Sequence, residues 1–150
     1  MKKHDGDSWM PADQFGRLLT GVGFNLLVKD MDPAIAFQKT VLQAEVVYAD
    51  PDFAVLKGYG GLWMLHADHT YSDHPLKGSL DDETPRGVGA ELRIYNCDPD
   101  AAEARARDAG YMVLAGAMDK PHGLREAYIL DDDGYLWVPG VGIGGGPRKR

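Results

Sequence analysis

Histidine side chains are the first residues in this sequence whose type and spacing could do chemistry. His66, His69 and His74 follow one another at spacings of three and five residues, and imidazole nitrogens gathered in this way can bind a transition metal ion. The segment lacks the paired carboxylates or cysteines that would complete such a site, and it is rich in turn residues. We therefore expect three solvated loop histidines rather than a metal cluster.

The motifs indicate neither a catalytic nucleophile nor a phosphate-binding loop. Cys97 is the only cysteine, and no histidine lies near it in sequence to act as its base. A single cysteine also excludes an internal disulfide bond and every zinc motif that needs paired thiolates. The glycine-rich string GVGIGGGP lacks the lysine and the following helix of a phosphate-binding loop. No catalytic residue is predicted.

Composition and charge indicate one folded domain with neither a nucleic-acid nor a membrane partner. The chain has 150 residues and a formal net charge of -7, with 44% hydrophobic and 26% charged residues. The acidic residues are spread along the chain, which argues against binding a phosphate backbone. No apolar run approaches the roughly 20 residues that cross a bilayer, and residues 1–17 lack the apolar core of a secretory signal. We expect a cytoplasmic protein.

The chain repeats itself once. GVGFNLLVKDMDP begins at Gly21, and GVGAELRIYNCDP begins at Gly87 and aligns with it without a gap. A second pair of similar strings follows in the same order, GGLWML from Gly60 and DGYLWVPG from Asp133. Two matches in the same order indicate a duplication within the chain.

The duplication predicts a single domain of two modules between two terminal segments. The modules span about residues 18–71 and 87–142, and the polar, turn-rich stretch 72–86 links them. Residues 1–17 are expected to form an N-terminal extension, and residues 143–150, which end in PRKR, a flexible tail.

Each module is expected to have the order β-α-β-β-β. Apolar residues alternate with others from Phe24 to Val28, which is typical of a strand, and Asp30, Asp32 and Pro33 then suit the start of a helix. The second half shows the same pattern. The expected helices cover 30–42 and 98–109, and the expected strands 24–28, 45–48, 53–57, 62–66, 91–95, 111–115, 126–130 and 135–138. The predicted fold class is α+β, with two tandem βαβββ modules forming a curved mixed sheet.

Two motifs in this order resemble the vicinal oxygen chelate superfamily, which includes glyoxalase I, bleomycin-resistance proteins and extradiol dioxygenases. They are L-x-V-x-D from Leu26 to Asp30 and the ending KPHGLREAYILDDDGYLW, in which Asp132 stands where proline is usual. The resemblance extends from about Leu18 to Gly142. It implies that the inner sheet face of each module lines a cup, which holds a divalent metal ion in the enzymes of this family.

The positions that correspond to the family's metal ligands carry unsuitable residues. The resemblance places them at Gly23, Met64, Gly89 and Val138. Glycine and valine offer no donor atom, and a thioether suits only soft metals. The better comparison within the family is therefore its metal-free bleomycin-resistance type, whose members are dimers that bind a small molecule in the cup. We expect no cofactor and a homodimer, whose modules pair either within one chain or across the dimer.

Polar residues lie two positions further along the same strands and on the same face. They are Asn25, His66 and Glu91. A displaced metal site built on His66 and Glu91, with Asn25 as a weak third ligand, is one interpretation. The other is that these side chains line a cavity and hydrogen-bond a ligand or ordered water.

The aromatic and basic residues divide between core and rim. Trp63 and Trp137 alternate with the cup-facing positions of their strands, so we expect them to pack against the helices. His122 and Arg125 precede a strand at the expected rim of the cup. Arg125 and Glu126 could also form a surface ion pair only.

The sequence thus predicts a small-molecule-binding protein of the bleomycin-resistance type that performs no chemistry. The predicted ligand-binding residues are Asn25, Leu27, Met64, His66, Glu91, Arg93 and Arg125. One alternative is a metal-dependent lyase, isomerase or dioxygenase that holds one divalent metal ion at His66 and Glu91. A further alternative is a filled cup in a purely structural dimeric module.

Overall fold

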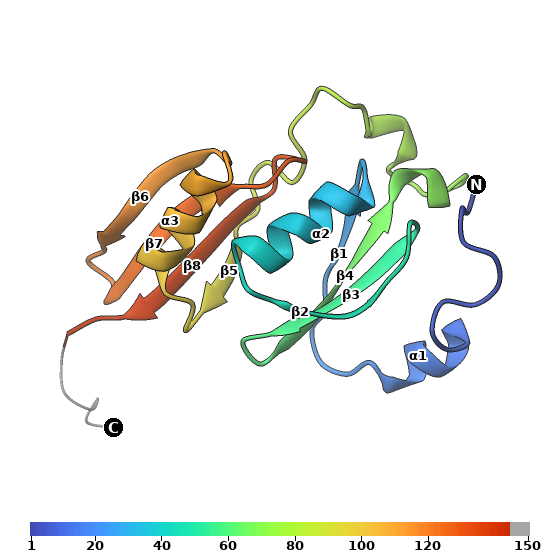
Figure 1. The fold of residues 1–150 in the computed structure, drawn as a ribbon, viewed down its shortest axis with the longest axis horizontal. Coiled ribbons are helices and arrows are strands. Elements are labelled where there is room, and N and C mark those ends of the chain that lie inside the picture. Colours follow the sequence, from blue (N-terminus) through green and yellow to red (C-terminus); the bar gives the residue numbers. More distant parts are fainter. Residues whose placement is uncertain (145–150) are drawn as a thin grey trace. The chain divides into compact units, whose positions relative to one another are not determined.

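The structure is a computed structural model that describes residues 1–144, and Figure 1 shows its two modules. It divides into two compact units, one of residues 1–39 and 43–84, the other of residues 40–42 and the chain from residue 85 onward. The predicted α+β class with two βαβββ modules is confirmed. The strands form two four-stranded sheets.

The first module has a sheet in the order β1-β4-β3-β2. Strand β1 runs parallel to β4, and the other neighbours are antiparallel. Its elements are β1 (Asn25–Val28), α2 (Met31–Thr40), β2 (Glu45–Ala49), β3 (Phe53–Gly58) and β4 (Gly61–Ala67).

The second module repeats this topology with the order β5-β8-β7-β6 and a parallel β5–β8 pair. Its elements are β5 (Leu92–Tyr95), α3 (Pro99–Asp108), β6 (Val113–Asp119), β7 (Leu124–Leu130) and β8 (Leu136–Gly142). Helix α3 packs on β6, β7 and β8.

Both helices begin where the aspartates predict. The side chain of Asp98 accepts hydrogen bonds from the backbone N–H groups of Asp100 and Ala101, at 3.0 and 3.2 Å, and Pro99 occupies the first turn of α3. Asp30 accepts a bond of 3.3 Å from the N–H of Asp32 at the start of α2. These bonds satisfy amide groups that have no partner within the helix.

The two matched tryptophans belong to the core. Trp63 is 2% exposed and Trp137 is fully buried. The indole of Trp63 donates a 3.0 Å hydrogen bond to the side-chain oxygen of Gln38 on α2. The face of the first sheet that carries Trp63 is therefore the helix-covered face, and strand alternation turns Met64 and His66 to the opposite face. We call this the open face of the first module.

Four features differ from the predicted elements, and one of them is that β8 continues to Gly142, beyond the predicted end at residue 138. A short helix, α1 (Ala12–Leu18), lies within the expected extension, and two 3₁₀ turns, η1 (Asp68–Thr70) and η2 (Lys77–Ser79), follow β4. Strand β6 extends to Asp119 through two register shifts. The ladder continues there because backbone hydrogen bonds do not require the apolar alternation on which the prediction depended.

Most of the expected tail, residues 145–150, lies outside the described residues. Within residues 1–144, none of the helices has both the length and the apolar character needed to cross a membrane.

The glycines that open the two repeats allow a matched test of the second module. Gly21 and Gly87 both have left-handed backbone angles, with φ of +73° and +68°. A Cβ atom at Gly87 would lie 2.5 Å from the ring of Tyr135, whereas one at Gly21 would meet no atom within 4 Å. We expect Gly21→Ala to lower the free energy of unfolding by about 1 kcal/mol and Gly87→Ala by at least about 2 kcal/mol. Urea unfolding measures both, and equal losses would contradict the close approach of Tyr135.

Candidate functional site

The open face of the first module brings four of the predicted ligand-binding residues together. In the parallel β1–β4 pair, Asn25 lies beside Met64 and Leu27 lies beside His66. Phe53 of β3 is the neighbour of His66 on the other side. One apolar ring, one thioether, one imidazole and one amide therefore occupy the same patch of sheet.

His66 is held in one tautomer by Asn25. Its Nδ1 lies 2.5 Å from the side-chain oxygen of Asn25. An amide oxygen can only accept, so Nδ1 carries the proton and Nε2 is left as a hydrogen-bond acceptor. Burial lowers the pKa of His66 to about 4, because a charged imidazolium loses solvation in this position. His66 is therefore neutral at pH 7.

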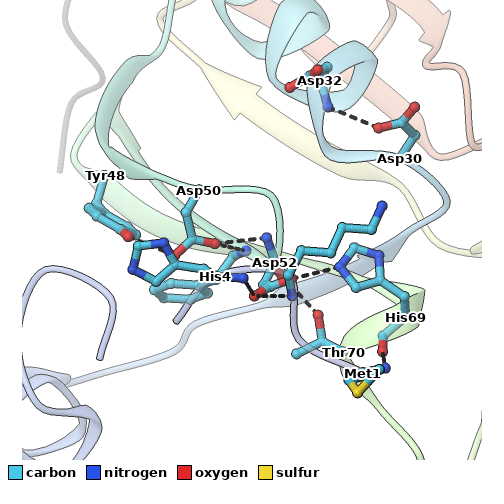
Figure 2. Close-up of polar contacts among 11 residues, drawn as sticks. Met1, His4, Asp30, Asp32, Tyr48, Asp50, Asp52, His69 and Thr70 are labelled. Atoms are coloured by element: carbon cyan, nitrogen blue, oxygen red, sulfur yellow. Dashed lines mark hydrogen bonds and ion pairs between the residues drawn. The ribbon is translucent and has the colours of Figure 1, made fainter. Parts of the chain in front are cut away.

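Residues 1–19, which we call the N-terminal segment, are attached to this face by a buried carboxylate. Asp52 is 2% exposed, and it accepts hydrogen bonds of 2.8 to 3.0 Å from the backbone N–H groups of Lys3 and His4. The Nε2 atom of His69 lies 2.6 Å from the same carboxylate. Figure 2 shows Asp52 with His4 and His69, together with the bond from the Met1 ammonium to the carbonyl oxygen of His69.

The electrostatics of Asp52 follow from these donors. Burial alone would raise its pKa, but the hydrogen bonds from the two backbone amides and from His69 hold the pKa of Asp52 at about 2. The carboxylate is therefore charged at neutral pH. Charge-assisted hydrogen bonds to backbone N–H groups are among the stronger polar interactions in proteins, so this attachment orders the start of the chain.

Aromatic rings form a second attachment of the N-terminal segment. Trp9 stacks on Tyr48 of β2 with ring centroids 5.2 Å apart. Phe15 of α1 contacts Trp9 at 5.0 Å and meets the edge of Phe53 at 5.9 Å. Ring pairs in these arrangements contribute about 0.5–1.5 kcal/mol each beyond the burial of their area. Helix α1 therefore contacts the sheet through Phe15, and the chain before it contacts the sheet through Trp9.

A cavity of about 230 Å³ lies between the N-terminal segment and the open face. Its apolar wall includes Trp9, Phe15, Phe53 and Met64, and its polar groups include His66 and Asp50. Asp50 accepts a 2.6 Å hydrogen bond from the hydroxyl of Tyr48. Apolar walls with a few placed polar groups are typical of small-molecule sites.

The second module carries a different, charged cluster. Glu126 of β7 is fully buried and forms an ion pair with Arg93 of β5. Tyr128 donates a 3.0 Å hydrogen bond to Glu126, and His122 lies 3.4 Å from the same carboxylate. Burial would raise the pKa of Glu126, but the bonds from Tyr128 and Arg93 outweigh it and lower the pKa. Arg93 also bonds Glu91 at 3.3 Å. The predicted residues Glu91 and Arg93 are therefore brought together.

Comparison with solved structures identifies the fold. TioX from Micromonospora sp. ML1 aligns with 85% of this chain and all of its own, with a TM-score of 0.60 and 21% identity. A glyoxalase/bleomycin resistance protein/dioxygenase from Nocardioides aligns over 91% of this chain and 95% of its own, with a TM-score of 0.62 and 21% identity. The chain has the glyoxalase/bleomycin-resistance/dioxygenase fold.

One solved structure with a similar fold contains a metal ion. The fosfomycin resistance protein FosX from Listeria monocytogenes, solved with Mn(II) and a sulfate ion, aligns with 83% of this chain and 92% of its own, with a TM-score of 0.62 and 17% identity. No model of a protein family matches the chain, and a search of curated proteins also finds no match. The comparisons therefore establish the fold and leave the ligand open.

The residues at the expected metal-ligand positions of this fold do not suit a divalent ion. Gly23, Gly89 and Val138 provide no donor atom, and Met64 provides a thioether. Of the two stronger donors in the displaced site, His66 is hydrogen-bonded to Asn25, and Glu91 is bonded to Arg93. Among residues 1–144, no three His, Cys, Asp or Glu side chains gather where they could hold a metal ion.

Within the second module, Arg125 does not join Glu91 and Arg93. It alternates with Glu126 along β7, so its side chain leaves the opposite face of the sheet. There it bonds Asp100 at the start of α3 at 2.8 Å and Asp119 of β6 at 3.0 Å. This placement favours the ion-pair interpretation of Arg125, although its partners are these aspartates and not Glu126.

The expectation of three solvated loop histidines is wrong for His66 and His69. His66 belongs to β4 and is half-buried, and His69 is tied to Asp52. The reason is long-range, because the N-terminal segment and Asp52 cover them. Sequence reasoning also missed Asp52, Trp9 and Glu126 as residues of these sites. The available signals were the aromatic residues in an expected extension and Glu126, a carboxylate within a predicted strand.

The attachment at Asp52 can be tested by removing its charge. We expect Asp52→Asn to increase the hydrogen exchange rate of the Lys3 and His4 amides at least tenfold, because an amide group cannot accept all the bonds that the carboxylate accepts. Glu83→Gln is the control, since it makes the same charge change at an exposed residue of the same unit. Unchanged protection in Asp52→Asn would show that the segment is held by its aromatic contacts alone.

The buried ion pair of the second module predicts unequal costs for two arginine substitutions. Arg93→Met leaves the carboxylate of Glu126 buried without its cation, so we expect a loss of about 2 kcal/mol in the free energy of unfolding. Arg125→Met makes the same chemical change among exposed aspartates and should cost less than Arg93→Met. Chemical denaturation measures both losses. A larger loss in Arg125→Met would contradict the assigned burial of Glu126.

Proposed function

We propose that this protein binds a small organic molecule in the cavity of the first module and performs no chemistry on it, as bleomycin-resistance-type proteins do. The observation that carries the proposal is the cavity of about 230 Å³ enclosed by the N-terminal segment and the open face. It is lined by two of the predicted ligand-binding residues, Met64 and His66, and a third, Asn25, is hydrogen-bonded to His66.

The chemistry of the walls supports an amphipathic ligand. Trp9, Phe15 and Phe53 provide flat apolar surfaces on which an aromatic or aliphatic group can pack. The Nε2 atom of His66 is an acceptor whose direction is fixed by Asn25. A site with few polar groups of fixed orientation gains affinity by apolar burial and selects its ligand by hydrogen bonding.

The residues at the metal-ligand positions and around the cavity support binding without catalysis. In the family that the sequence resembles, the enzymes use a metal ion as a Lewis acid. The corresponding positions in this chain carry glycine, valine and a methionine thioether. His66 is neutral, and its one identified polar partner is an amide. The residues around the cavity can therefore orient a molecule, and the paired Asp52 and His69 hold the N-terminal segment to the sheet. We also propose, from the sequence, that the protein is a cytoplasmic homodimer. Light scattering of the purified protein tests whether it is a dimer.

Ligand-observed NMR with a panel of small aromatic compounds tests this function. The panel comprises indole, phenol, 2-phenylethanol, 2-phenylethylamine and 3-phenylpropionate. We expect saturable binding of at least one compound and a loss of at least tenfold in its affinity in Met64→Trp, which fills the cavity. Leu62→Trp is the matched control, because Leu62 lies on the same strand and does not line the cavity.

Two results would contradict the proposal. The first is the absence of saturable binding by every compound in a folded protein, with folding checked by circular dichroism. The second is stoichiometric Ni, Zn, Mn or Fe in the purified protein that is lost in His66→Ala, which would favour the metal-dependent alternative.

A further inference from the structure

The cavity has an excess of negative charge. Among the residues that line it, Asp7, Asp50 and Asp52 are acidic, and Lys2 is the one Lys or Arg side chain. The carboxylate of Asp52 is kept ionised by the amides that it accepts from. Charges around a partly enclosed, low-dielectric space act on a ligand more strongly than charges on an open surface.

Two of the polar side chains that line the cavity, His66 and Asp50, present hydrogen-bond acceptors. His66 donates through Nδ1 to Asn25 and presents Nε2 as an acceptor. Asp50 already accepts from the Tyr48 hydroxyl and from the backbone N–H groups of Asp52 and Phe53. Asp50 therefore acts mainly through its charge, whereas His66 can receive a proton-bearing group of the ligand.

Aromatic rings favour the same kind of ligand. Trp9, Phe15 and Phe53 line the cavity, and their rings form one connected group across the N-terminal segment and β3. The face of an aromatic ring attracts an organic cation through its quadrupole, most strongly in the case of tryptophan. The same faces pack against apolar groups, so they suit a molecule that carries both.

Building on the proposed function, we infer that the ligand of this cavity is an organic cation, a protonated amine carried on a small aromatic or other apolar group. The amine would donate to Nε2 of His66 in the field of Asp7, Asp50 and Asp52, and the apolar part would lie among the rings. An anionic ligand would meet three carboxylates and a histidine that is neutral and turns an acceptor toward it.

Three probes of similar size separate charge from shape. They are 2-phenylethylamine, 2-phenylethanol and 3-phenylpropionate, which at pH 7 are a cation, a neutral molecule and an anion with the same ring. Isothermal titration calorimetry on the full chain measures their affinities. We expect the amine to bind at least tenfold more tightly than the alcohol, a difference of about 1.4 kcal/mol, and the anion to bind most weakly. Higher salt should reduce the preference for the amine.

A pair of aspartates in the N-terminal segment provides matched variants. Asp7 lines the cavity and Asp5 does not, and both side chains belong to exposed residues. We expect Asp7→Asn to weaken binding of the amine about threefold and to leave binding of the alcohol unchanged, whereas Asp5→Asn should change the two affinities little. Neither substitution removes a hydrogen bond that holds the segment.

The outcomes distinguish this inference from the function on which it rests. If the alcohol or the anion binds as tightly as the amine, or if Asp7→Asn and Asp5→Asn have equal effects, the ligand is not selected by positive charge and the inference is wrong, while the proposed function stands. If none of the three probes binds, and the rest of the panel also fails, both are wrong.

Discussion

The candidate site of the first module depends on the buried carboxylate of Asp52. A charge in this position is costly unless donors surround it, and two of its donors are backbone amides from residues 3 and 4, which lie far away in the sequence. The carboxylate therefore attaches the start of the chain to the sheet. The cavity exists because this attachment, together with the stacking of Trp9 on Tyr48, holds a second wall over the open face.

The two modules share a topology and have diverged in the chemistry of the same sheet positions. Counted from the matched tryptophans, Phe53 of β3 corresponds to Glu126 of β7, because each lies three residues before the partner of the tryptophan in its own sheet. In the first module this position is a ring beside His66. In the second it is a buried carboxylate neutralised by Arg93. The two modules therefore have the same strand pairing and different side chains at the same sheet position.

Most of the fold could be predicted from local patterns. The period of two near Leu26 and Leu92, the aspartate caps and the repeated opening strings depend on neighbours in sequence, and all of them correspond to observed elements. Four of the predicted ligand-binding residues share one face for the same reason, since alternation along β1 and β4 determines it. Three features could not be predicted: the contact of His69 with Asp52, the burial of Glu126 and the second wall of the cavity. Each depends on a contact between segments that are distant in sequence.

Because the attachment uses main-chain groups, it does not depend on which side chains Lys3 and His4 carry. Lys3 and His4 bind Asp52 through backbone N–H groups, so the identity of their side chains does not enter the bond. The anchor would survive extensive sequence drift at these positions, provided that neither becomes proline, which has no N–H group. Gly6, Asp7, Ser8 and Met10, which line the cavity, can then change while Trp9 keeps its contact with Tyr48 and the sheet stays as it is. Selectivity could evolve, or be engineered, by exchanging one short stretch of chain.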